Sequence, residues 1–144
     1  MITFERLRPA HIRFIEVQPV QTGELSSIIT PEASEALATY HGVSAWQSGV
    51  CLAAAGFIPQ WPGRATCWAL LSRHAGKGMV AIARRMAAEV EMYNRHCVRV
   101  EMQVRHDFEQ GHKLARMLGF EVETLHAPKF FPDGAGATLY ARVR

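Results

Sequence analysis

The sequence of 144 residues lacks the marks of several protein classes. Its longest unbroken apolar run, Val50 to Ile58, is half of what a membrane-spanning helix needs. Its cysteines, Cys51, Cys67 and Cys97, are odd in number and show no C-x-x-C spacing, which argues against a disulfide framework or a zinc knuckle. The first residues carry neither the basic segment nor the apolar stretch of a signal peptide. We expect a cytoplasmic protein with three buried, reduced thiols and no membrane contact.

Long basic runs and metal-binding spacings are missing as well. The seven histidines form no H-E-x-x-H or comparable cluster, so no metal is expected. The net charge of +3 divides into −2 over residues 1–60 and +5 over residues 61–144. Thirteen of the sixteen cations are arginine, whose planar guanidinium suits phosphate. We therefore expect an anionic ligand in the C-terminal half, whereas nucleic acid would call for a stronger positive excess.

What is present is an ordinary globular composition, with 49% apolar and 20% charged residues over a length that fits one domain spanning residues 1–144. Apolar periodicity divides the chain into strands and helices. Strands are predicted at residues 2–6, 43–47, 50–58, 65–71, 98–104, 120–125 and 137–143. Helices are predicted at residues 9–16, 30–40 and 79–93, and from a capping-box-like start at Asp107 to Gly119. Turns or loops are predicted at residues 18–27, 48–49, 60–63 and 128–136.

The order of these elements predicts the fold class. Three consecutive strands in the middle of the chain predict an antiparallel meander. The strand–helix–strand unit over residues 65–104 predicts one parallel pair, because a crossover helix returns the chain to the same edge. We therefore predict a mixed α+β domain with three layers (α/β/α) and a mostly antiparallel sheet.

A glycine-rich loop separates the strand ending at Leu71 from the helix beginning at Met79. Gly76 and Gly78 allow backbone N–H groups to approach a ligand, and a helix N-terminus favours negative charge. This arrangement suits a phosphate or pyrophosphate, although a plain glycine-rich connection would show the same residues. The spacing is neither that of a Walker A loop nor that of a dinucleotide-binding loop.

The hexamer Arg73-His74-Ala75-Gly76-Lys77-Gly78 resembles the R/Q-x-x-G-x-G/A loop with which GCN5-related N-acetyltransferases (GNATs) hold the pyrophosphate of acetyl-CoA. The element order over nearly the whole chain resembles theirs, and residues 114–120 resemble their "L-G-F" junction. The resemblance implies a GNAT-like acyl-CoA N-acyltransferase fold with acetyl-CoA as co-substrate. It implies that residues 73–78 bind the pyrophosphate and that the CoA lies in a wedge between two splayed strands, residues 65–71 and 97–104. Backbone groups of Leu70 and Leu71 would hold the pantetheine arm, and an N–H there would polarise the thioester carbonyl.

The chain departs from the family at two positions with chemical roles. Ala115 stands where the family commonly has a Tyr that acts as the acid for the leaving thiolate. Phe108 stands where the family often has an Asn that contacts the pantetheine. Glu101 is a candidate base acting through a water, or else a solvated strand carboxylate. His106 is a candidate base at neutral pH, or else a surface or capping histidine. Tyr140 is a candidate acid, or else a packed and hydrogen-bonded side chain.

Two functions follow from the resemblance. One is acetyl transfer from acetyl-CoA to an amine of a small molecule or a protein. The other is a catalytically degenerate GNAT-like protein with a binding or structural role, for example in a phage particle or against a host factor. The stretch from Cys67 to Ser72 is similar to small bacteriophage-encoded GNAT-like proteins, so a virion location stands beside the cytoplasmic one. A homodimer is compatible with either function.

Overall fold

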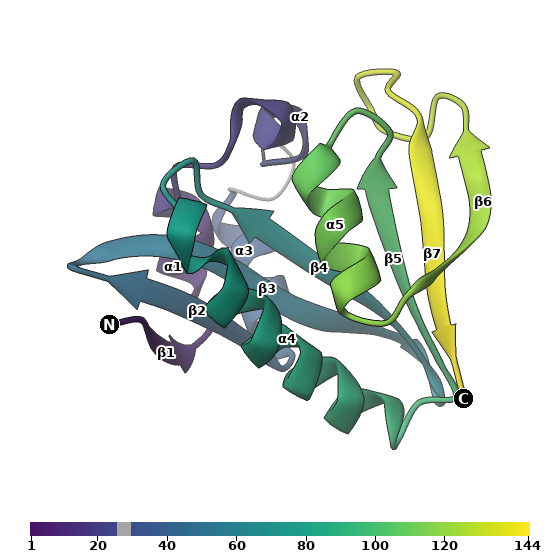
Figure 1. Cartoon of the computed structure of the whole chain (residues 1–144), viewed down its shortest axis with the longest axis horizontal. Coiled ribbons are helices and arrows are strands. Elements are labelled where there is room, and N and C mark those ends of the chain that lie inside the picture. Colours follow the sequence, from purple (N-terminus) through teal and green to yellow (C-terminus); the bar gives the residue numbers. More distant parts are fainter. Residues whose placement is uncertain (26–29) are drawn as a thin grey trace. The chain divides into compact units, whose positions relative to one another are not determined.

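The computed structural model describes residues 1–25 and 30–144 (Figure 1). Its strands are β1 (Thr3–Arg6), β2 (Gly42–Gln47), β3 (Val50–Trp61), β4 (Arg64–Leu71), β5 (Arg99–Arg105), β6 (Glu121–Ala127) and β7 (Ala137–Val143). Its helices are α1 (Pro9–Phe14), α2 (Thr22–Leu25), α3 (Pro31–Thr39), α4 (Met79–Asn94) and α5 (Glu109–Met117), with 3-10 turns at Pro19–Gln21 and Gly76–Gly78.

The seven strands form one sheet in the order β1-β2-β3-β4-β5-β7-β6. β1 pairs with β2, β2 with β3, and β7 with both β5 and β6, all in antiparallel fashion. β4 and β5 are parallel, with Arg64–Thr66 in register with Arg99–Glu101. The predicted mixed α+β architecture, with one parallel pair in a mostly antiparallel sheet, is confirmed.

The chain forms two compact units, which are described separately. The first unit comprises residues 1–58 and 68–82, and the second comprises residues 59–67 and 83–144. β3, β4 and α4 each contribute residues to both units.

In the first unit, α1 and α3 lie on the same face of β2 and β3 (Figure 1). Pro9 opens α1 and Pro31 opens α3, where a missing N–H has no cost. The Thr30 side chain caps α3 by accepting a hydrogen bond from the Ala33 N–H at 3.2 Å. The core beneath α1 is formed by five buried residues: Leu7, Ile12, Ile15, Ala54 and Leu70.

In the second unit, α5 packs against β5 (Figure 1). Gly111 permits this approach, because a Cβ there would lie 2.8 Å from Val104 Cγ1 and 2.5 Å from Phe108 Cδ2. Gly119 ends the helix at a φ of +85°, the position that the sequence assigns to it. Gly111, Leu114 and Ala115 form the buried face of α5.

Several predicted boundaries were wrong. Residues 19–25, expected to be loop, form the 3-10 turn and α2, while residues 26 and 27 of that loop lie outside the described residues. β3 runs three residues further than predicted, to Trp61, because Gly63 at a φ of +93° allows a tight turn with Pro62. The N-cap of α5 is Phe108 rather than Asp107, without a side-chain cap.

The cysteines are free, with Cys67 buried and Cys51 and Cys97 half-buried. Burial raises the pKa of Cys67 to about 12 and that of Cys51 to about 11, so both are protonated at neutral pH. In the described part of the chain, no helix has the length and apolar character to cross a membrane. Residues 1–25 and 30–144 also contain no group of His, Cys, Asp and Glu side chains that could hold a metal ion.

Candidate functional site

The glycine-rich loop lies in the first unit, between β4 and α4. Gly76 has a φ of +26°, and a Cβ at this position would meet nothing within 4 Å. A Cβ at Gly78 would lie 2.9 Å from Ile2 Cδ1 and 3.1 Å from Leu52 Cδ1. Gly76 is therefore required by the backbone conformation, whereas Gly78 is required by packing.

Most backbone N–H groups of this loop already donate to protein oxygens. Four of them have acceptors at 2.7–3.1 Å: Arg73, His74, Ala75 and Gly78. Within the described structure, Gly76 and Lys77 are the loop residues before α4 whose N–H groups have no protein acceptor. These adjacent N–H groups, just ahead of the α4 N-terminus, are the ones that an anion can reach.

The loop cations differ in their surroundings. The Arg73 guanidinium binds the Glu16 carboxylate, with Nε at 3.1 Å and a terminal nitrogen at 3.0 Å. His74 Nε2 lies 3.3 Å from the same carboxylate oxygen. The hydrogen bond to His74, followed by the charge of Arg73, lowers the pKa of Glu16. Arg73 is therefore paired with a carboxylate, whereas exposed Lys77 is the loop cation without a carboxylate partner in the described structure.

The end of β4 is covered by residues 17–21 on the edge away from β3. Ser72 N–H donates to Leu52 of β3, so the backbone groups of Ala69 and Leu71 face the other edge. The Leu71 N–H donates to Gln21 Oε1 at 2.8 Å, and Gln21 Nε2 donates to the Ala69 carbonyl at 2.9 Å. The Gln18 N–H donates to the Leu71 carbonyl at 3.0 Å.

Backbone groups expected to hold the pantetheine arm thus already have protein partners at this end of β4. The resemblance assigns the Leu71 N–H to the pantetheine arm or the thioester carbonyl. In this structure it donates to the Gln21 side chain, which is 1% exposed. Gln21 must move before a ligand can take that N–H. The Leu70 side chain lies in the core beneath α1 and does not face a ligand.

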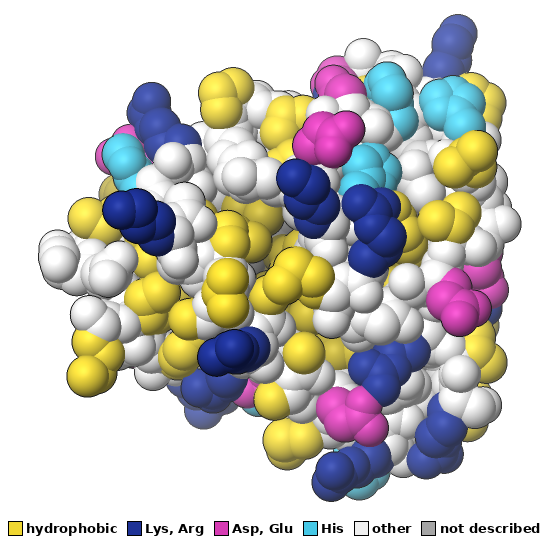
Figure 2. All heavy atoms as spheres, viewed as in Figure 1, with side chains coloured by type: hydrophobic (Ala, Val, Ile, Leu, Met, Phe, Trp, Pro, Cys, Tyr) yellow, Lys and Arg dark blue, Asp and Glu magenta, His cyan; other side chains and the backbone are white. Residues whose placement is uncertain are grey.

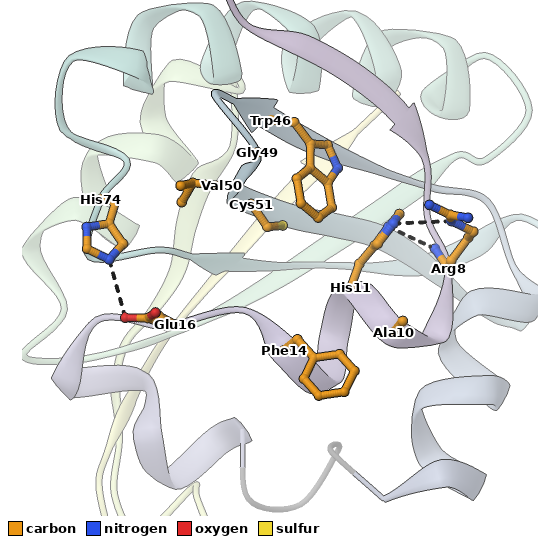
Figure 3. A pocket seen from close by; sticks show the side chains of 10 residues that line it. All are labelled: Arg8, Ala10, His11, Phe14, Glu16, Trp46, Gly49, Val50, Cys51 and His74. Atoms are coloured by element: carbon orange, nitrogen blue, oxygen red, sulfur yellow. Dashed lines mark hydrogen bonds and ion pairs between the residues drawn. The ribbon is translucent and has the colours of Figure 1, made fainter.

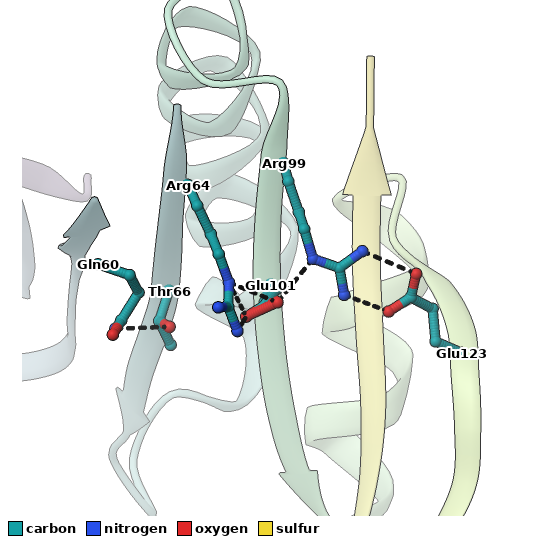
Figure 4. A network of polar contacts seen from close by, with 6 residues as sticks. All are labelled: Gln60, Arg64, Thr66, Arg99, Glu101 and Glu123. Atoms are coloured by element: carbon teal, nitrogen blue, oxygen red, sulfur yellow. Dashed lines mark hydrogen bonds and ion pairs between the residues drawn. The ribbon is translucent and has the colours of Figure 1, made fainter. Parts of the chain in front are cut away.

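Glu101 lies on β5 in the second unit, inside a network of charges (Figure 4). Arg64 Nε donates to its carboxylate at 2.9 Å and Arg99 Nε donates at 2.6 Å. Arg99 extends across β7 to Glu123 on β6, to which its Nη1 donates at 2.9 Å (Figure 4). One carboxylate thus connects β4 with β5, and one guanidinium connects β5 with β6.

The expectation of a solvated Glu101 is wrong, because the residue is 8% exposed. Burial by itself raises the pKa of this carboxyl, but the hydrogen bonds from Arg64 and Arg99 outweigh burial and bring the pKa below its ordinary value of 4.5. A carboxylate held by two guanidinium groups has little basicity. Its position indicates a role in strand pairing.

His106 follows the end of β5 and is exposed. Its N–H donates to the Gly136 carbonyl at 3.0 Å, and its ring Nδ1 lies 3.3 Å from the same oxygen. A carbonyl only accepts, so Nδ1 carries the proton and Nε2 holds the lone pair. Of the two predicted bases, His106 is the one whose basic nitrogen is not held by cations.

A second histidine, which the sequence did not indicate, forms a pair with Tyr140. His112 Nε2 lies 3.0 Å from the His106 carbonyl and must donate to it. His112 Nδ1 therefore accepts from the Tyr140 hydroxyl at 2.8 Å. Tyr140 is 3% exposed, as the packed and hydrogen-bonded alternative predicted.

The predicted site residues fall into two groups. Leu70 to Gly78 belong to the first unit, while Glu101 and His106 belong to the second. Ala115 and Phe108, at the two positions that depart from the family, are both buried in the second unit and offer no polar group.

The sequence matches no protein-family model and no curated protein. The fold is nevertheless similar to solved acetyltransferase structures along the chain. The yncA protein of Salmonella typhimurium, solved with its cofactor acetyl-CoA, has a TM-score of 0.67 at 15% identity, over 99% of this chain and 93% of the other. The ribosomal-protein-S5-alanine acetyltransferase of Vibrio fischeri has a TM-score of 0.69 at 14% identity, over 99% and 92%. A GNAT-family acetyltransferase of Bacillus anthracis has a TM-score of 0.68 at 9% identity, over 99% and 94%. The chain therefore has the mixed α+β GNAT fold.

Proposed function

We propose that the protein is an N-acetyltransferase that moves the acetyl group of acetyl-CoA to an amine of a small molecule or a protein. The observation that carries this proposal is the pair of N–H groups on Gly76 and Lys77, placed between β4 and α4 of a GNAT fold. Structures with this fold include one that holds acetyl-CoA. We further propose that the whole chain acts as a single domain.

In this proposal the pyrophosphate accepts hydrogen bonds from the Gly76 and Lys77 N–H groups. The Lys77 ammonium supplies the charge that Arg73 does not, because Arg73 is bound to Glu16. Lysine and arginine are spread over the face drawn in Figure 2, among acidic and histidine side chains, and form no continuous patch there. We therefore assign phosphate binding to the local anion site and not to a broad basic surface on this face.

The chemical step is direct attack of the amine. Nε2 of His106 takes a proton from the acceptor ammonium group, and the freed amine nitrogen attacks the thioester carbonyl carbon. The new C–N bond forms as the C–S bond breaks, the nitrogen loses its second proton to become the amide, and that proton balances the one taken up by the departing CoA thiolate to give the thiol. Glu101 does not serve as the base, because two arginines hold its carboxylate.

The second candidate function is binding without catalysis. It is favoured by the Gln21 side chain, which occupies the backbone groups of Ala69 and Leu71, and by the apolar residues Ala115 and Phe108. Such a protein would bind a protein partner, of a phage particle or of a host, and would release no CoA from acetyl-CoA.

The first prediction concerns the loop and uses two substitutions at one glycine. Gly76→Glu places a carboxylate where the pyrophosphate should lie, whereas Gly76→Ala brings the same backbone strain without the charge. We expect Gly76→Ala to retain acetyl-CoA binding within about tenfold and Gly76→Glu to lose at least a further hundredfold. Calorimetric titration of wild type and both variants with acetyl-CoA measures this. Equal affinities of the two variants would contradict the loop assignment.

Catalysis is measured separately, as thiol release from acetyl-CoA in the presence of a panel of amines. We expect His106→Gln to lower the rate about 100-fold with unchanged acetyl-CoA affinity, because a general base contributes about that much. Tight acetyl-CoA binding without thiol release for any amine would favour the binding protein.

A further inference from the structure

A pocket of about 400 Å³ lies in the first unit, between α1 and the β2–β3 hairpin (Figure 3). This volume is within the range of small-molecule sites. The pocket includes His74 but none of the groups that we assign to the pyrophosphate. It is therefore a second candidate site.

A bulge in the hairpin directs an aromatic side chain toward this pocket. Ala45 pairs with Ala53 and Trp46 pairs with Cys51, so Leu52 is the extra residue of β3. The Trp46 indole N–H donates to Ser44 Oγ at 2.8 Å, which satisfies its polar atom and fixes the ring. Trp46 can therefore present an apolar face to a ligand without further hydrogen bonding.

Phe14 supplies the second aromatic surface, from α1. Its side chain is 78% exposed, which is unusual for phenylalanine. Figure 3 shows Phe14 and Trp46 on opposite sides of the pocket, with Cys51 between them and Val50 to one side, toward His74. The middle of the pocket is thus apolar and suited to a flat hydrophobic group.

One end of the pocket presents hydrogen-bond donors in excess. His11 is 4% exposed, and its Nδ1 lies 3.1 Å from the Arg8 backbone N–H. Its Nε2 lies 3.3 Å from Arg8 Nε, which also carries a proton. A neutral imidazole has one unprotonated nitrogen, so it can accept only one of these two hydrogen bonds. Accepting the shorter one, from the backbone, leaves Nε2–H and the Arg8 Nε–H as two donors that face each other.

The charged groups around the pocket determine whether these donors favour an anionic or a neutral ligand. Burial, followed by the charge of Arg8, lowers the pKa of His11, so its ring is neutral at neutral pH. The carboxylate near Arg8 is that of Glu5, whose Oε1 lies 3.9 Å from Arg8 Nη2, and both side chains are exposed. Glu16, at the other end of the pocket, is held by Arg73 and His74. The Arg8 end therefore retains donors that a ligand oxygen can satisfy.

We propose that this pocket binds a small aromatic carboxylate. One carboxylate oxygen accepts from His11 Nε2–H, and the exposed Arg8 side chain turns its guanidinium away from the ring to donate to the same carboxylate. The aromatic ring lies between Trp46 and Phe14. Binding here does not depend on acetyl-CoA or on acetyl transfer.

The test uses phenylacetate, with phenylacetamide as its neutral isostere. By calorimetry we expect wild type to bind phenylacetate at least tenfold more tightly than phenylacetamide, because the amide lacks the charge. We expect Arg8→Gln to lower phenylacetate affinity about tenfold. Arg6→Gln removes the same charge from β1, outside the pocket, and should leave the affinity unchanged.

Phe14→Ala provides a second test, because the residue is exposed and its loss does not open the core. This variant should weaken phenylacetate and phenylacetamide by the same factor. Equal binding of acid and amide, equal effects of the two arginine variants, or no phenylacetate binding by folded wild type would overturn the proposal. Acetyl-CoA titration of Arg8→Gln should match wild type, and this separates the pocket from the proposed enzymatic function.

Discussion

Gln21 occupies the end of β4 as a neighbouring strand would. Its carboxamide accepts from the Leu71 N–H and donates to the Ala69 carbonyl, the two types of bond that strand pairing provides. The side chain is 1% exposed, so water does not replace these bonds when they are lost. Any ligand that uses this edge of β4 competes with a residue of the protein itself.

Gln21→Met keeps the size of the side chain but removes both hydrogen bonds. We expect the free energy of unfolding to fall by about 1–3 kcal/mol, because a buried donor and acceptor are left unpaired. If the pantetheine arm of acetyl-CoA takes over these groups, acetyl-CoA will raise the melting temperature of the variant more than that of wild type. Thermal melts with and without acetyl-CoA measure both effects.

Gln60→Met is the matched control for that experiment. Gln60 is exposed on β3 and its amide nitrogen donates to the Thr66 hydroxyl, away from this edge of β4. Its replacement should change neither stability nor the acetyl-CoA shift by a measurable amount. Equal shifts in wild type and Gln21→Met would show that acetyl-CoA does not use the Leu71 N–H.

At the scale of elements, ionic contacts join strands that are far apart in the sequence. The Glu101 carboxylate on β5 holds Arg64 of β4 beside Arg99, and Arg99 reaches Glu123 on β6. Two arginines on neighbouring parallel strands would repel each other without this carboxylate. The network thus supports the parallel pair on which the fold depends.

Glu101→Gln should lower the free energy of unfolding by about 1.5–3 kcal/mol at neutral pH, the usual contribution of hydrogen bonds to charged groups. The pKa of Glu101 is lowered in the folded state, so its contribution is fully present above the ordinary value of 4.5 and disappears as the pH falls through the folded value. Urea unfolding between about pH 6 and about pH 3 measures this. The difference between wild type and variant should shrink toward the acid end.

Glu121→Gln serves as the control, because Glu121 is an exposed carboxylate on the same sheet. Its effect on stability should be small at every pH. If the difference in free energy of unfolding between wild type and Glu101→Gln stays constant with pH, the ionised Glu101 carboxylate is not the source of the stabilisation.

At the scale of the whole molecule, local patterns predicted the elements and long-range partners escaped prediction. Alternating apolar residues and the Gly76 and Gly78 spacing are local, and they located the strands, the loop and the parallel pair. The partners of the site residues lie far along the chain: Gln21 is 50 residues from Leu71, and His112 is 28 from Tyr140. No periodicity encodes such pairs, so the covered edge of β4 and the histidine–tyrosine contact required the structure.

β3, β4 and α4 each have residues in both compact units, and this affects how the chain unfolds. A strand shared by two units cannot lose its partners in one unit without losing backbone hydrogen bonds that border the other. We therefore expect a single unfolding transition. Trp46 and Trp68 lie in the first unit and Trp61 lies in the second. One variant that keeps only Trp61 and one that keeps only Trp46 and Trp68 therefore give a separate tryptophan fluorescence signal for each unit. Coincident urea midpoints for the two fluorescence signals and for circular dichroism would support one domain, and distinct midpoints would divide the chain into two independently stable parts.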